Sequence, residues 1–351
     1  MPANPINRSP NGFIGVTFFF VLSGYLISSN LLYLKRSIMA GELSTGRALG
    51  IFYVRRSLRI FPLYFFVILA VYFLAKGMFE GNVVWYLTYL PNILMYKTGR
   101  WPGMLSHFWS LGVEEQFYFI WPLLIFTTGW KWMKPLFIGI VAGSLLFKFI
   151  CFLHDPAFSA KYFLLPISSF DAFGLGAILA LMPFSGRPEK RTIDKLGFLP
   201  GFFGSAVLAA LAYTGGFFFL FPLMLSCASF FIIRQARGGF TGLFGKIVDL
   251  PVLRYLGKIS YGLYVYHNFM PWIWRCITGQ ETANPLPIIL MRNPVLNKPL
   301  VALGAQVLLL VLIASASWFL FEKPLNDLKN VIAGGGRHAK KTPAPETSQV
   351  S

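Results

Sequence analysis

Charged side chains are scarce in this sequence. Only 13% of its 351 residues are Asp, Glu, Lys or Arg. A soluble domain carries roughly 25% charged residues, so about half of the usual water-facing charge is absent. Hydrophobic residues make up 56% of the chain, and a soluble helical domain would need charged faces to cover them. The composition therefore excludes an ordinary soluble globular protein.

Cysteine and histidine are also rare, with three and four copies. Cys151, Cys227 and Cys276 lie far apart and show neither metal-ligand nor disulfide spacing, so we interpret them as packing residues. No phosphate-binding loop or nucleotide-binding fingerprint is present. The sequence thus predicts no metal site and no nucleotide-binding domain of a known pattern.

Long hydrophobic runs are what the sequence has in abundance. They fall at 12–34, 59–76, 106–128, 133–153, 162–183, 196–214, 216–233, 252–274 and 299–321. One helix needs about 20 apolar residues to cross the hydrocarbon core of a membrane. The runs predict an all-α, polytopic transmembrane bundle with about nine crossings. The segment 83–96 is amphipathic and is expected to be interfacial or re-entrant.

The net charge of +18 suggests nucleic acid at first sight, but its distribution does not. The basic residues form short clusters in every second connection between the hydrophobic runs, beginning with Lys35 and Arg36 after the first run. This is the pattern of cytoplasmic loops in membrane proteins. We expect a multi-pass protein of the inner (cytoplasmic) membrane with a cytoplasmic C-terminus, contacting membrane lipids and no nucleic acid.

The chain divides into three predicted parts. Residues 1–11 form a short polar leader, and 12–325 form the helical membrane domain. Residues 326–351 are basic and rich in Lys, Pro, Thr and Ser, and we expect them to be a disordered cytoplasmic tail.

Two adjacent carboxylates, Glu114 and Glu115, lie inside the third hydrophobic run. On a helix, His107, Ser110, Glu114 and Tyr118 share one face, whereas Glu115 points about 100° away. Ionisable groups at membrane depth are costly and usually face the bundle interior or a wet cavity. We interpret the pair as a proton-transfer site or a clamp for hydroxyls. The alternative is a structural network that satisfies itself between helices.

Three arginines, Arg55, Arg56 and Arg59, lie at the start of the second hydrophobic run. Such residues set topology, but Arg55 and Arg59 are four apart and share a helical face. We expect them at the start of a helix, where the dipole already favours an anion. Arginine suits phosphate because it offers paired N–H donors. A phosphorylated donor or a lipid headgroup is therefore the predicted ligand.

Two further residues, Asp171 and His267, each allow two interpretations. Asp171 could be catalytic, but an acid beside small residues more often bonds a neighbouring helix, and we favour that structural role. His267 lies towards the outer half of its run and is either a proton handler or an interfacial aromatic-belt residue.

Five segments, in this order, resemble the acyltransferase-3 family of membrane O-acyltransferases. They are Gly15-Val16 through Ile27, Arg55-Arg56-Ser57-Leu58-Arg59-Ile60-Phe61-Pro62-Leu63-Tyr64, Trp109-Ser110-Leu111-Gly112-Val113-Glu114-Glu115-Gln116-Phe117-Tyr118 with Trp121-Pro122, Leu256-Gly257-Lys258-Ile259-Ser260-Tyr261 through His267, and Phe321-Glu322-Lys323-Pro324. The resemblance covers about 12–325.

The resemblance implies transfer of an acyl group, commonly acetyl from acetyl-CoA, to a hydroxyl of a glycan or another extracytoplasmic polyol. It implies that Arg55, Arg56 and Arg59 hold the acyl-CoA donor. Candidate catalytic residues are Glu114, Glu115, Ser110 and His267.

One feature of the family is missing. The family opens with a helix that bears an Arg and a His regarded as the catalytic base, and no residue before Gly12 matches it. We expect the nine crossings to be the family's ten minus the first, in a truncated or inactive copy. The alternatives to an enzyme are a transporter or flippase, or an inactive acyltransferase-like scaffold.

Overall fold

The computed structural model describes residues 11–155, 160–185, 191–278 and 298–333. Every regular element within these ranges is a helix, as the sequence predicted. The chain forms two compact units. The first unit contains the described residues up to Ala48 and those of Val71–Lys258. The second contains Leu49–Ala70 and the described residues from Ile259 onward.

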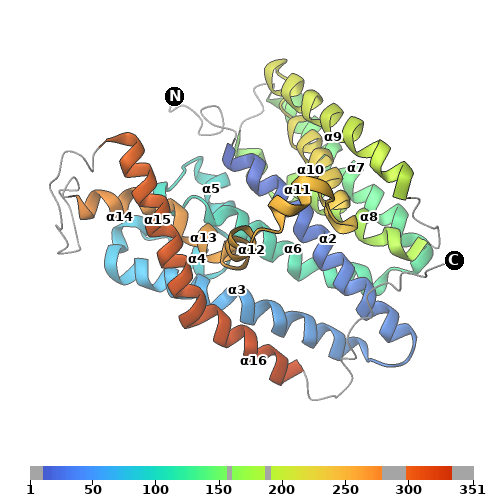
Figure 1. The fold of residues 1–351 in the computed structure, drawn as a ribbon, viewed down its shortest axis with the longest axis horizontal. Coiled ribbons are helices and arrows are strands. Elements are labelled where there is room, and N and C mark those ends of the chain that lie inside the picture. The colour runs from blue at the N-terminus through green and yellow to red at the C-terminus, as the bar shows by residue number, and fades with distance from the viewer. Residues whose placement is uncertain (1–10, 156–159, 186–190, 279–297, 334–351) are drawn as a thin grey trace. The chain divides into compact units, whose positions relative to one another are not determined.

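The first unit is built mainly from six longer helices. These are α2 (Asn11–Met39), α6 (Phe108–Thr127), α7 (Trp130–His154), α8 (Phe170–Leu181), α9 (Arg191–Thr214) and α10 (Phe221–Gly238). Helix α2 packs against α6, α8 and α10, while α7 packs on α8 and α9 on α10 (Figure 1). Aromatic rings fill the core, with Phe117 stacked on Phe173 at 3.9 Å between ring centroids. This unit also holds the short helices α4 (Val83–Leu87), α5 (Pro91–Thr98), α11 (Gly242–Val248) and α12 (Pro251–Lys258).

Helices α2 and α8 touch through their backbones. A Cβ atom at Gly176 would collide with the carbonyl oxygen of Val21 and the backbone of Gly24. A Cβ atom at Gly24 would collide in turn with the backbone of Phe173. Small residues allow this close approach, which membrane helices use in place of a hydrophobic driving force.

We expect Gly176→Val to destabilise the protein by about 3 kcal/mol or more, because the added side chain meets backbone that cannot rotate away. Thermal unfolding in detergent micelles measures the change. Gly143→Val on α7 is the matched control, since a Cβ atom there has nothing within 4 Å. Equal melting temperatures for the two variants would contradict the backbone contact.

Lys35 joins α2 to the end of α6. Its Nζ donates to the carbonyl oxygens of Ile125 at 2.8 Å, Phe126 at 3.2 Å and Thr128 at 2.6 Å. The last carbonyls of a helix lack intrahelical partners and carry the negative end of its dipole. The lysine, which the sequence analysis counts only as a topology signal, is buried and caps α6.

The second unit contains part of α3 (Thr45–Ala75) and the chain after Lys258. Its further elements are α13 (Ser260–Tyr266), η6 (His267–Phe269), α14 (Met270–Ile277), α15 (Pro299–Ser317), the π-helical turn η8 (Trp318–Glu322) and α16 (Lys323–Ala333). Helix α15 packs against α13 and α14. Helix α3 is joined to α13 by the Tyr261 hydroxyl, which donates to the carbonyl oxygen of Ile60 at 2.8 Å.

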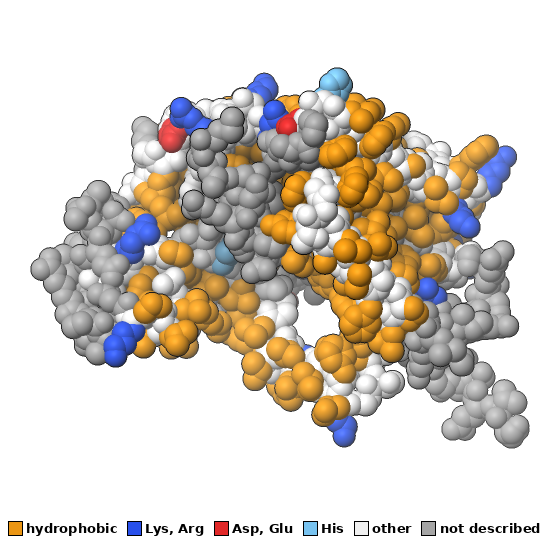
Figure 2. Space-filling model, turned by 90° about the horizontal axis from the view of Figure 1, so that it is seen from above, with side chains coloured by type: hydrophobic (Ala, Val, Ile, Leu, Met, Phe, Trp, Pro, Cys, Tyr) orange, Lys and Arg blue, Asp and Glu red, His pale blue; other side chains and the backbone are white. Residues whose placement is uncertain are grey.

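Five helices in the described residues are long and apolar enough to cross a membrane. They are Gly12–Met39, Thr45–Ala75, Trp130–His154, Pro166–Phe184 and Pro299–Leu328. Hydrophobic side chains cover much of the surface in Figure 2, where few basic or acidic groups interrupt them. Phe73, Phe119 and Leu300 are among the large apolar side chains left exposed. The chain is a multi-pass membrane protein, and the predicted number of nine crossings stays a prediction.

The structure differs from the sequence expectation at 252–274, where a single crossing was predicted. The helix is interrupted at Ile259, whose backbone leaves the helical region, and again around the short turn η6. Pro271 opens α14 and has no N–H to continue a preceding helix. Several short helices therefore take the place of one long one.

The prediction of a disordered tail from residue 326 is wrong for its first residues. Helix α16 continues to Ala333, so 326–333 are helical. Leu325 and Leu328 are three residues apart and lie on the same side of this helix. The prediction of disorder considered only the polar composition of the segment and not this spacing. The leader up to residue 10 and the tail from residue 334 lie outside the described residues.

Candidate functional site

Glu114 is the centre of a buried polar cluster in the first unit. Ser23 on α2 donates from its hydroxyl to Oε1 of Glu114 at 2.6 Å. Tyr118, one turn further along α6, donates its hydroxyl to the same oxygen. Ser23, Glu114 and Tyr118 are all buried. The predicted shared face of Glu114 and Tyr118 is confirmed by this contact.

Ser110 and His107 lie on the preceding turn. The Ser110 hydroxyl donates to the carbonyl oxygen of His107 at 3.1 Å. His107 is buried, immediately before the first residue of α6, and its ring lies 4.3 Å from that of Phe108. The structure thus places Ser110 one turn from Glu114, as predicted, with its hydroxyl turned back to the helix start.

The neighbouring carboxylate, Glu115, is half-buried and sits on a different side of α6 from Glu114. The next residue, Gln116, donates to the carbonyl oxygen of Tyr89 and to Oδ1 of Asn92, both at 2.9 Å. Asn92 in turn donates to the carbonyl oxygen of Leu164 at 2.9 Å. This amide network holds α5 against α6 and leaves Glu114 as the carboxylate that faces α2.

The arginine group lies on α3 in the second unit. Arg55 and Arg59 are exposed, and the Arg56 guanidinium lies 6.0 Å from the ring centroid of Phe52. The prediction that these residues begin a helix is wrong, because α3 starts at Thr45 and they lie well inside it. The free N–H groups of a helix end are therefore not beside them. Any anion would be held by the guanidinium groups themselves.

His267 is exposed and lies in the turn η6, also in the second unit. Its Nδ1 lies 2.6 Å from the carbonyl oxygen of Tyr264. A hydrogen bond to a carbonyl requires the proton on Nδ1, which fixes the tautomer of the neutral ring. His267 belongs to the second unit and Glu114 to the first.

Asp171 forms a buried ion pair that the sequence analysis missed. Nζ of Lys148 on α7 lies 2.6 Å from Oδ2 of Asp171 on α8, and both side chains are fully buried. Ser144 donates to the other carboxylate oxygen at 3.4 Å. The expectation that Asp171 bonds a neighbouring helix is confirmed. A lysine inside an otherwise apolar run, more than one helical turn from either end, was the available signal for its partner.

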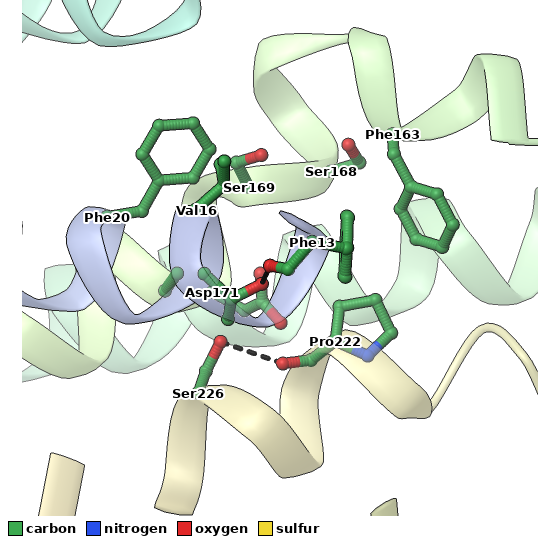
Figure 3. A pocket seen from close by; sticks show the side chains of 11 residues that line it. Phe13, Val16, Phe20, Phe163, Ser168, Ser169, Asp171, Pro222 and Ser226 are labelled. Carbon is green, nitrogen blue, oxygen red and sulfur yellow. Dashed lines mark hydrogen bonds between the residues drawn. The ribbon is translucent and has the colours of Figure 1, made fainter. Parts of the chain in front are cut away.

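A small cavity borders Asp171 (Figure 3). Hydroxyl groups of Thr17, Ser168 and Ser226 line it together with aromatic rings. Ser226 donates to the carbonyl oxygen of Pro222, as Figure 3 shows. The cavity volume of about 10 Å³ has room for about one water molecule and for no substrate. Within the described residues, no group of three His, Cys, Asp or Glu side chains could hold a metal ion.

Comparison with known proteins identifies the family. The family described as an acyltransferase domain matches residues 3–322. The chain is 29% identical over 313 residues to the peptidoglycan O-acetyltransferase OatA of Listeria monocytogenes, a match that covers 76% of this chain and 48% of OatA. It is also 29% identical over 293 residues to the O-acetyltransferase OatA of Staphylococcus aureus, covering 73% of this chain and 45% of the relative.

The chain spans about half the length of these curated relatives. No solved structure shows significant similarity to it. The family match nevertheless extends over nearly the whole sequence and includes both the Glu114 cluster and the arginine group. The chain therefore belongs to the acyltransferase-3 family.

Proposed function

We propose that this protein is a membrane O-acyltransferase that moves an acyl group, in particular acetyl, from acyl-CoA to a hydroxyl of a glycan or similar extracytoplasmic acceptor. The family match over residues 3–322 carries the proposal. The relatives named as O-acetyltransferases, one of them for peptidoglycan, support an acceptor in the cell envelope.

The transfer exchanges one bond of the acyl carbonyl carbon. The acceptor oxygen forms a new ester bond to this carbon, and the bond to the sulfur of coenzyme A breaks. The acceptor hydroxyl loses its proton, and the departing sulfur gains one. A buried carboxylate is suited to take the first proton, and Glu114 is held in place for this by Ser23 and Tyr118.

The donor would be held by the arginine group. Coenzyme A carries several phosphates, and guanidinium groups bind phosphate through paired N–H donors. Arg55 and Arg59 are exposed and one turn apart on α3, so both can reach the same anion. The alternating basic clusters support an inner-membrane location with this group and the C-terminus on the cytoplasmic side.

We expect the double variant Arg55→Ala/Arg59→Ala to weaken coenzyme A binding by about 100-fold, since each hydrogen bond from a charged group is worth about 1.5–3 kcal/mol. Equilibrium binding of coenzyme A to the protein in lipid nanodiscs measures this. Arg254→Ala is the control, because Arg254 on α12 is exposed. Its Nη2 lies 3.0 Å from Oδ1 of Asp249.

Transfer itself is tested with radiolabelled acetyl-CoA and a soluble glycan acceptor in the same nanodiscs. We expect the radiolabel to appear in the glycan, with one molecule of free coenzyme A released for each acetyl group transferred. Donor binding without either product would instead identify an inactive scaffold. Unchanged donor binding in the double arginine variant would overturn the assignment of the donor site.

A further inference from the structure

Asn92 on α5 is a fully buried amide in the first unit, and it bonds reciprocally to Gln116 on α6. Nε2 of Gln116 donates to Oδ1 of Asn92 at 2.9 Å, and Nδ2 of Asn92 donates back to Oε1 of Gln116 at 3.3 Å. The second N–H of each amide reaches a backbone carbonyl oxygen at 2.9 Å, that of Leu164 from Asn92 and that of Tyr89 from Gln116. All four N–H groups of the two side chains thus have an acceptor, and a largely buried network satisfied in this way is rigid.

The backbone just before α5 is held in an unusual conformation against α6. Tyr89, whose carbonyl oxygen accepts from Gln116, has a φ of 56°. A bulky residue rarely adopts a positive φ and keeps one only where its surroundings enforce it. Gly112 on α6 lies against the same point, because a Cβ atom there would come within 2.9 Å of the Tyr89 carbonyl oxygen and of Oδ1 of Asn92. The segment before α5 therefore packs on this side of α6 without spare room.

Glu114 lies on the other side of the same helix. Gly112 and Gln116 are four residues apart and share one side of α6, whereas Glu114 is about 200° around the axis from each. On that other side, Oε1 of Glu114 accepts from the Ser23 hydroxyl of α2 at 2.6 Å. Fixing the Gln116 side of α6 on α5 therefore also fixes the direction in which Glu114 points.

We propose that Asn92 and Gln116 are positioning residues for acyl transfer, which set the rotation of α6 about its own axis and so aim the Glu114 carboxylate at the acceptor hydroxyl. The proposal rests on the function proposed above, in which Glu114 takes the acceptor proton. A rotation of about 20° moves a side-chain end about 5 Å from the helix axis by about 2 Å. A general base must stay within hydrogen-bond reach of its proton, and a misplacement of about 1 Å can cost about 100-fold in rate.

A purely structural role makes a different prediction. If the amide pair only stabilised the fold, its loss would lower the yield of folded protein and leave the rate of each folded molecule unchanged. If it aims Glu114, its loss slows each folded molecule and also removes the benefit of Ser23. Ser23 meets α6 from α2, whereas Gln116 faces α5, so a coupling between the two acts through the direction of Glu114.

A double-mutant cycle on glycan acetylation by the full chain in lipid nanodiscs measures this coupling, with wild type, Ser23→Ala, Gln116→Met and the double variant. Rates are expressed per coenzyme A site, counted by binding on the same preparation. We expect Gln116→Met to lower kcat about tenfold with an unchanged KM for acetyl-CoA. Ser23→Ala should cost about tenfold in the wild type and less than twofold beside Gln116→Met, because the carboxylate then no longer faces Ser23.

A swap of the two amides tests the same geometry by rescue. Asn92→Leu alone is expected to lower kcat about tenfold, like Gln116→Met. The double variant Asn92→Gln/Gln116→Asn keeps two amides that can bond reciprocally and should retain kcat within about threefold of the wild type. Asn82→Leu is the matched control, because Asn82 is a half-buried amide before α4 whose Nδ2 donates to the carbonyl oxygen of Glu80 at 3.1 Å.

The outcomes separate this inference from the proposed function. A wild-type protein that transfers no acetyl group, or a Glu114→Gln variant with the wild-type rate, overturns the function or the role of Glu114 itself. A slow Glu114→Gln variant beside a Gln116→Met variant with normal kcat overturns only the positioning role, and so does a cycle in which the two losses multiply. Should the amide variants fold poorly, Gly112→Ala replaces Gln116→Met in the cycle, since its methyl group pushes α5 away and leaves both amides in place.

Discussion

Acyl transfer is expected to fall by about 100- to 10,000-fold when Glu114 is replaced by glutamine, the range that general-base catalysis contributes. Glutamine keeps the size of the side chain and an oxygen that accepts from Ser23 and Tyr118. It removes the negative charge and the capacity to take a proton. Coenzyme A binding is expected to remain unchanged, because the arginine group is intact.

Initial rates of glycan acetylation and equilibrium coenzyme A binding, measured on the same nanodisc preparation, check this result. Ser23→Ala keeps the carboxylate and removes one of its hydrogen-bond donors, so a smaller loss of about tenfold is expected. Glu80→Gln controls for the loss of an exposed acid. A Glu114→Gln variant with the wild-type rate would leave Glu114 with the structural role that the sequence analysis kept as its alternative.

Replacement of Lys148 by methionine is expected to lower the free energy of unfolding by about 3–5 kcal/mol. The variant leaves the Asp171 carboxylate buried without its cation, and the remaining contact to Ser144 is long at 3.4 Å. The cost comes from the uncompensated charge more than from the lost attraction.

Adding Asp171→Asn to Lys148→Met should therefore recover most of the loss, since neither side chain is then charged. Unfolding in mixed detergent micelles measures both variants. Lys134→Met is the control because Lys134 lies exposed on the same helix, α7. A single Lys148→Met variant as stable as the wild type would mean that the pair contributes nothing to the fold.

The sequence predicted those features that depend on local spacing. The hydrophobic runs became helical, although 252–274 is divided among several short helices. Glu114 and Tyr118 lie one turn apart on one face of α6, where they bond to each other. Periodicity is sufficient for such contacts because residues four apart on a helix are neighbours.

Contacts between distant segments could not be predicted in this way. Ser23 meets Glu114 across 91 positions, and the pairing of Lys148 with Asp171 depends on how α7 packs on α8. Helix ends also could not be predicted from the hydrophobic runs. Helix α3 begins at Thr45, because the basic segment before the apolar run is helical as well.

The lysine that caps α6 changes how the charge of this protein meets its membrane. Lys35 is enclosed among three carbonyl oxygens, so it is not available to the phosphates of anionic lipids. At this end of α2, the exposed Arg36 is left to interact with headgroups. A juxtamembrane cation near the surface contributes about 1 kcal/mol of attraction to an anionic leaflet. The electrostatic attraction to lipid at this point is thus weaker than a count of basic residues suggests. The charge of Lys35 stabilises the end of α6 instead.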